Sequence, residues 1–202
     1  MDHSSLYERI LKAVDERAYF TPADAVDPAQ RDAMREIGAR LHAPDMDPAA
    51  LRPWIHRLHA EGRIDRVHLL SALHVVAASP KVADWSEAAR LAGEQELAAL
   101  ELGGPHLDAN LASVDRHRGV LAFLRGHHSV ALDHFTRALE RQRTAENVGN
   151  VLAALLKLGE IEEAEEILAQ VRRTLSPSMV ADLSRAIDTD PDLAALRGPE
   201  PL

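Results

Sequence analysis

Residues 148–171 read VGNVLAALLKLGEIEEAEEILAQV, and this stretch decides the fold. Apolar residues recur in it with the spacing of one helix face up to residue 158, and a second apolar stripe begins at residue 161. Gly159 separates the two stripes, and glycine adopts the left-handed backbone angles of a tight turn without steric cost. Ala164 is small enough to let two helices approach closely. The stretch therefore predicts an antiparallel helical hairpin that turns at Gly159.

A second copy of this pattern lies 33 residues earlier in the chain. Four positions of the earlier copy return in the later one with the same or a similar residue: Gly126, Ala131, Phe135 and Ala138 become Gly159, Ala164, Leu168 and Val171. A fixed period of this length is typical of stacked supersecondary units, each of which buries its apolar face against the next. The repetition therefore predicts stacked hairpins.

The two copies resemble the tetratricopeptide (TPR) repeat family, whose unit is a hairpin of two helices. The later copy has apolar or small residues at the positions that the family packs: Val148, Val151, Leu152, Leu155, Ala164, Leu168 and Val171. The earlier copy departs from the family in its first helix, where Asp115 and Arg118 replace large apolar residues, although Gly119 matches the small position. The resemblance is clearest over residues 111–175 and implies an all-α fold, a TPR-like right-handed α-solenoid of stacked hairpins. Another helical repeat, such as HEAT, stays open as an alternative.

Two earlier glycines fall close to the same period. Gly62, Gly93, Gly126 and Gly159 are 31, 33 and 33 residues apart, which would make four units. Residues 82–102 are compatible with two short helices broken at Gly93. They are equally compatible with one Ala-rich helix that contains this glycine at a cost of about 1 kcal/mol.

The chain is expected to have three parts. Residues 1–62 form an N-terminal helical region without repeats, residues 63–175 carry the repeats, and residues 176–202 form a capping helix and a tail. Pairs of Asp or Ser with Pro predict where helices begin, because they provide a cap followed by a first helical residue. The expected helices outside the repeats cover residues 4–18, 28–41, about 49–60 and 177 to about 187, with a short turn after Asp190 and a frayed end over 198–202.

Composition supports an all-helical protein and excludes several classes of function. Hydrophobic residues make up 46% of the 202 residues, aromatic residues only 3%, and no stretch alternates apolar and polar residues as a strand would. The net charge is −9 and basic residues do not cluster, so nucleic acid is not expected as a partner. No long apolar run or cationic leader predicts a membrane segment, so we expect a cytoplasmic protein. The chain has no cysteine, which removes thiolate metal sites and cysteine nucleophiles.

Eleven histidines are the main candidates for chemistry. His56 and His59 lie three residues apart on an expected helix, so their rings could share a metal ion. The pair lacks the glutamate of the His-Glu-x-x-His hydrolase motif, and His117 and His134 are expected to be exposed or satisfied locally. Phosphate-binding and nucleophile-elbow motifs are also missing. We therefore expect no catalytic residues, no cofactor and no metal.

The resemblance also indicates a binding surface. In TPR proteins the first helix of each hairpin lines a concave groove, which places these residues on or near that surface: Arg116, Val120, Phe123, Asn147, Asn150, Ala153 and Lys157. Val120 stands where carboxylate-binding TPR domains have Asn, so a peptide held by apolar contacts and by Asn hydrogen bonds to its backbone is the better hypothesis. The function implied is a non-enzymatic protein–protein interaction module, an adaptor or scaffold that binds a peptide or partner protein.

Two other functions stay open: a dedicated chaperone or regulatory subunit of an enzyme or secretion system, and a metalloenzyme that uses His56 and His59. A homodimer is a further expectation, because an apolar stripe follows the second copy: Met179, Val180, Leu183 and Ile187. It would apply if no later helix covers that stripe.

Overall fold

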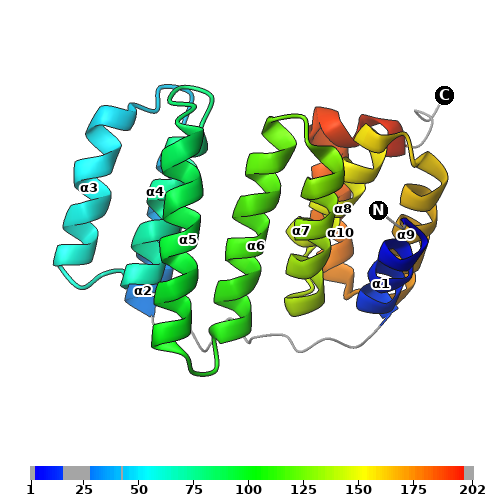
Figure 1. Ribbon diagram of the computed structural model, residues 1–202, viewed down its shortest axis with the longest axis horizontal. Coiled ribbons are helices and arrows are strands. Elements are labelled where there is room, and N and C mark those ends of the chain that lie inside the picture. Colours follow the sequence, from blue (N-terminus) through cyan, green and yellow to red (C-terminus); the bar gives the residue numbers. More distant parts are fainter. Residues whose placement is uncertain (1–2, 16–27, 42, 198–202) are drawn as a thin grey trace. The chain divides into compact units, whose positions relative to one another are not determined.

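The computed structural model describes residues 3–15, 28–41 and 43–197, and within these ranges the chain forms helices and no strand. This confirms the all-α expectation for the described residues. This part of the chain forms ten α-helices and one short 3-10 helix; the α-helices are labelled in Figure 1. Their bounds are α1 His3–Asp15, α2 Pro28–Leu41, α3 Pro48–Ala60, α4 Arg66–Ala78, α5 Trp85–Leu102, α6 Leu107–Leu124, α7 His128–Arg141, α8 Ala145–Leu158, α9 Ile161–Thr174, α10 Pro177–Thr189 and η2 Pro191–Leu196.

The chain divides into two compact units. Unit 1 comprises residues 1–20 and 122–202, and unit 2 comprises residues 21–121, so the boundary lies inside α6. The expected division at residues 62 and 175 does not follow this boundary. The physical reason lies within unit 1, where α1 packs against α7 and α9, and α10 packs against α8.

In unit 1 the predicted hairpin over residues 148–171 is confirmed. α8 ends at Gly159, whose φ of +84° is left-handed and whose N–H is donated to the carbonyls of Leu155 and Leu156. α9 then begins at Ile161 and packs against α8. The equivalent glycine of the earlier copy, Gly126, has a φ of +77° between α6 and α7. The helices of unit 1 enclose a tightly packed core whose largest fully buried side chains include Ile10, Leu132, Leu139, Leu152, Ile167, Leu183 and Leu193.

The C-terminal helices close one side of α8. α10 begins at Pro177 with Ser176 as its N-cap, as predicted, and Asp190 caps η2. Both elements pack against α8, and a Cβ placed on Gly149 would lie 3.8 Å from a methyl group of Leu183 and 3.9 Å from one of Leu193. Three of the four residues of the predicted stripe, Met179, Leu183 and Ile187, are therefore buried within the chain, whereas Val180 is half-buried. The uncovered stripe that the expectation of a homodimer required is thus reduced to Val180.

In unit 2, α4 packs against α5, and α2 and α3 pack against α4. α2 covers the expected 28–41, and α3 begins at Pro48 after Asp47, whose carboxylate accepts a hydrogen bond from the Ala49 N–H. α5 is one continuous helix of 18 residues, from its N-cap Asp84 to its C-cap Gly103, and it contains Gly93.

This observation decides between the two interpretations of residues 82–102. The helix continues through Gly93 because buried residues lie on both sides of it along one apolar face: Ala88, Leu91, Ala92, Ala98 and Ala99. The glycine period therefore does not mark a turn at Gly93.

Some expectations fall on residues outside the described ranges. These are the end of the first helix after Asp15, the Asp27 cap and the tail over residues 198–202. Among the described helices, none combines the length and the apolar run that crossing a bilayer requires.

Candidate partner-binding surface

The seven residues of the predicted groove fall into both units. Arg116 and Val120 belong to unit 2, whereas the other five, Phe123, Asn147, Asn150, Ala153 and Lys157, belong to unit 1. Within unit 1, α8 provides four of them and the last turns of α6 provide Phe123.

Asn147 is not on an accessible surface. Only 1% of the residue is exposed, and its Nδ2 group donates to the carbonyls of Gln142 at 2.7 Å and Ala138 at 3.3 Å. The hydroxyl of Thr144 accepts a hydrogen bond from the Asn147 backbone N–H at 3.1 Å. The residue therefore ties the end of α7 to the start of α8. Helical spacing placed Asn147 on or near a groove surface of α8, but it could not show that the side chain is enclosed at the junction of α7 and α8.

Ala153 and Lys157 are also engaged within unit 1. Ala153 is buried, and the Lys157 Nζ lies 2.7 Å from the Asp192 carboxylate of η2. The C-terminal segment therefore covers part of the face of α8 that the TPR resemblance assigns to a partner.

Asn150 lines an open hollow beside these contacts. The pocket has a volume of about 440 Å³ and is lined by residues of α8, α10 and η2 and of their caps: Thr144, Ala145, Glu146, Gly149, Asn150, Asp182, Ala186, Asp190 and Leu193. Asp182 pairs with Arg185 at 3.1 Å, and Asp190 accepts a hydrogen bond from the Asp192 backbone N–H at 2.9 Å. The pocket thus combines the Asn150 amide with three carboxylates and with an apolar side. The carboxylates belong to Glu146, Asp182 and Asp190, and the apolar side is formed by Leu193, Ala145 and Ala186.

Phe123 lies in the last turn of α6 and contacts aromatic side chains of α7 within unit 1. Its ring meets His128 in a T-shaped contact with centroids 5.1 Å apart, and it lies 6.4 Å from the ring of Phe135. Because the residue is only half-buried, one side of it is accessible. In unit 2, Val120 is half-buried and an Nη of Arg116 lies 3.5 Å from the Ser113 hydroxyl.

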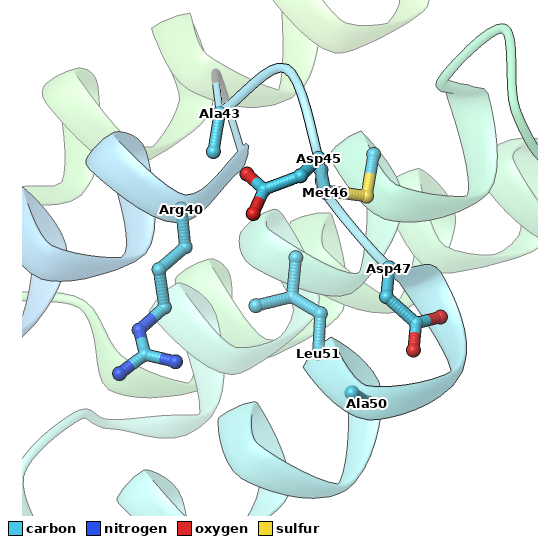
Figure 2. Close-up of a pocket in the computed structure, with 7 residues that line it drawn as sticks. All are labelled: Arg40, Ala43, Asp45, Met46, Asp47, Ala50 and Leu51. Atoms are coloured by element: carbon cyan, nitrogen blue, oxygen red, sulfur yellow. The ribbon is translucent and has the colours of Figure 1, made fainter.

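A smaller pocket of about 260 Å³ lies in unit 2, where α2 connects to α3. Figure 2 shows the Arg40 side chain extending away from the loop that carries Asp45 and Asp47. The Arg40 guanidinium lies 4.3 Å from the centre of the Trp54 ring and pairs with Glu36 at 3.2 Å. Asp47 caps α3. The charged groups here therefore serve the local structure.

The two histidines considered for metal binding, His56 and His59, have different surroundings. His56 is exposed, while the Nδ1 of His59 lies 3.0 Å from the carbonyl of Ile64, to which it can donate. The described residues contain no group of three or more His, Asp or Glu side chains placed to hold a metal ion.

Sequence reasoning missed a buried polar cluster in the middle of unit 2. The rings of His74 and His117 are stacked with centroids 4.2 Å apart, and the Nδ1 of His117 lies 2.9 Å from the Gln95 carbonyl oxygen. His74 and Gln95 were detectable in principle, because each interrupts an apolar stripe, in α4 and α5 respectively. A polar residue on such a stripe is expected to have a buried partner, but the sequence does not indicate which one.

Comparison with known proteins finds no match to this chain among protein-family models, curated proteins or solved structures.

Proposed function

We propose that this protein is a non-enzymatic interaction module built from TPR-like helical hairpins, and that it binds a peptide or partner protein on unit 1. The observation that carries the proposal is the pocket of about 440 Å³ beside Asn150, on the helix that the TPR resemblance assigns to partner binding. The pocket provides an accessible hollow on that helix, next to a well-packed core.

The repeated burial pattern of unit 1 supports the TPR-like part of the proposal. The three pairs of positions that repeat after the glycines are buried in both copies: Ala131 with Ala164, Phe135 with Leu168 and Ala138 with Val171. Both glycines are left-handed, and each lies two residues before the start of a helix, α7 after Gly126 and α9 after Gly159. Stacked hairpins with equivalent cores are how repeat proteins form extended binding surfaces.

The chemistry of the pocket indicates how a polypeptide would be held. The Asn150 amide offers one acceptor and two donors, which match the N–H and C=O groups of a peptide backbone. Asn147, Ala153 and Lys157 make contacts within unit 1. Of the four predicted binding residues on α8, we therefore assign partner binding to Asn150. Leu193 and the two alanines would contribute apolar contact, and the carboxylates would favour a partner with a neutral or positive segment.

Quantitative capture of partners from the native cell, with the full chain as bait, tests this function. The baits are the natural chain, an Asn150→Ala variant and a Glu165→Ala variant as matched control, since Glu165 is exposed on α9. We expect at least one polypeptide whose recovery falls roughly fivefold or more with Asn150→Ala, because losing buried hydrogen bonds costs about 1 kcal/mol or more. Recovery should be unchanged with Glu165→Ala, and both variants should unfold at the natural midpoint. Equal recovery with all three baits would contradict the proposal.

A further inference from the structure

The stacked pair of histidines in unit 2 is almost completely withdrawn from water. His74 lies in the middle of α4 and is 1% exposed, and His117 lies in α6 and is 4% exposed. Their ring planes are within 15° of parallel. Gln95 of α5 is 0% exposed and completes the cluster, so three helices meet at these side chains.

Hydrogen bonds define the protonation state in which the cluster fits together. The Nδ1–H of His74 donates to the Ala88 carbonyl at 2.8 Å, and the Nδ1–H of His117 donates to the Gln95 side-chain oxygen at 2.9 Å. In a neutral imidazole this tautomer leaves Nε2 without a proton, whereas a charged ring would carry a second proton there. The Nε2 of His117 lies 3.5 Å from the Ser71 hydroxyl, and the Nε2 of His74 has no hydrogen-bond partner among the described residues. Two neutral imidazoles satisfy this arrangement, because a second proton on the buried Nε2 of His74 would meet no acceptor in the part of the chain that the structure describes.

A positive charge on either ring would be unfavourable for three reasons. It would be buried, it would lie face to face with a second imidazole, and it would be close to Arg116 of α6. Burial is the main cause that lowers the pKa of His74 below its usual value, with Arg116 adding to it, although the hydrogen bond to the Ala88 carbonyl acts in the opposite direction. Burial likewise lowers the pKa of His117 well below its usual value, and His74 and Arg116 contribute to the same effect.

Several other charged groups on the surrounding helices of unit 2 form ion pairs of their own: Arg118 with Glu96, Arg90 with Glu94, Arg52 with Glu87 and Arg40 with Glu36. Asp115 is buried two residues before His117 on α6, a spacing that turns the two side chains to different faces of the helix.

We propose that the His74–His117 stack is an acid-sensitive switch for unit 2: protonation separates the two rings and loosens the packing of α4 and α5 against α6. The residues of this switch are different from those that line the pocket proposed for partner binding in unit 1.

The direction of the pH dependence follows from proton linkage. In the opened state both histidines regain an ordinary pKa of about 6.5. In the closed state both pKa values are lower, so the opened state binds more protons as the pH falls below about 6.5. The closed state is therefore fully favoured above that pH. Below it, the equilibrium shifts toward opening by up to roughly tenfold per pH unit for each histidine.

Tryptophan fluorescence of the full chain measures this equilibrium selectively. The chain has two tryptophans, Trp54 and Trp85, and both belong to unit 2. We expect the urea midpoint of the fluorescence change to be constant between pH 8 and 7 and to fall steadily between pH 6.5 and 5. A His74→Phe variant, which keeps an aromatic ring in the stack, should lose about half of this dependence. The matched control His56→Gln changes an exposed histidine of the same unit and should keep the natural profile.

A second measurement decides the matter even if the His74→Phe variant does not fold. NMR titration of the histidine ring protons in the natural chain should show two rings that stay neutral at pH 6 and change together with the loss of unit 2 signals. A urea midpoint that is constant from pH 6.5 to 5, a full pH dependence in the folded His74→Phe variant, or a ring of the pair that is protonated at pH 6.5 would overturn the proposal.

Discussion

The two units bury polar side chains at different points of their helices. In unit 1, Arg143 and Asn147 lie at the junction of α7 and α8 and donate to backbone carbonyls, Arg143 to that of Ala13 at 2.9 Å. In unit 2, His74, Gln95 and His117 lie in the interior of helices, and His117 bonds and stacks with the other two side chains. The first arrangement supplies donors to backbone carbonyls at helix ends. The second depends on two imidazoles remaining neutral.

Because of this difference, we expect the stability of the two units to depend on different interactions. The interior of α8 and α9 is made of aliphatic side chains, so unit 1 depends on close packing and on its helix-end hydrogen bonds. Unit 2 has an apolar core as well, but it also buries His74, Gln95 and His117. We therefore expect the stability of unit 2 to depend on pH. Three predictions sharpen the comparison or break it.

The largest effect is expected for Leu152→Ala in unit 1. Leu152 is fully buried in α8, and its replacement leaves a cavity that should lower the free energy of unfolding by about 2–5 kcal/mol. Urea unfolding followed by circular dichroism measures the loss, and hydrogen exchange should show it in peptides of α8 and α9. The control is Ile161→Ala, at a residue that is 47% exposed, which should cost less than about 0.5 kcal/mol. A similar loss for both variants would mean that unit 1 is not held by its aliphatic core.

An intermediate effect is expected for Asn147→Ala. The substitution leaves the carbonyls of Ala138 and Gln142 without their donor, which should cost about 1–3 kcal/mol. Because no proton is taken up or released, the loss should be the same at pH 8 and pH 5. The matched control is Asn150→Ala, in which a half-buried amide of the same helix is removed with little effect on stability. A loss that grows as the pH falls would contradict the contrast between the two units.

The smallest effects are expected for two glycines and have opposite signs. Gly93→Ala in α5 should stabilise the protein by about 0.5–1 kcal/mol, because Gly93 is helical and a Cβ there would meet no atom within 4 Å. Gly159→Ala should destabilise it by about 1 kcal/mol, because the φ of +84° is strained for any residue with a side chain. Thermal unfolding of both variants measures the two shifts. If both substitutions shift the unfolding midpoint in the same direction, the contrast between a helical Gly93 and a left-handed Gly159 is wrong.

Local signals in the sequence predicted most of the helices. Pro28, Pro48 and Pro177 begin helices as expected, and Gly159 ends one, since each acts through its own backbone geometry. Gly93 left two interpretations open, because a glycine can end a helix or be contained in one, and the packing on both of its sides decides.

The candidate site was less predictable. Helical spacing placed Asn147 and Asn150 on α8, but it could not show that one amide meets α7 while the other faces a pocket beside α10. The stack of His74 on His117 joins residues of two helices separated by α5, and no periodic pattern encodes which polar residues of different helices meet. Contacts of this kind depend on the tertiary arrangement of the helices.

The packing of α1 against α7 and α9 has a consequence for synthesis on the ribosome. Unit 2 is one uninterrupted stretch of chain, so all of its helices have emerged once residue 121 leaves the exit tunnel. The amphipathic helix α1 emerges first but docks on elements made much later, so its apolar face, with Leu6, Ile10 and Val14, stays uncovered until α9 has been translated. A nascent chain stalled between these two points would expose that face to chaperones.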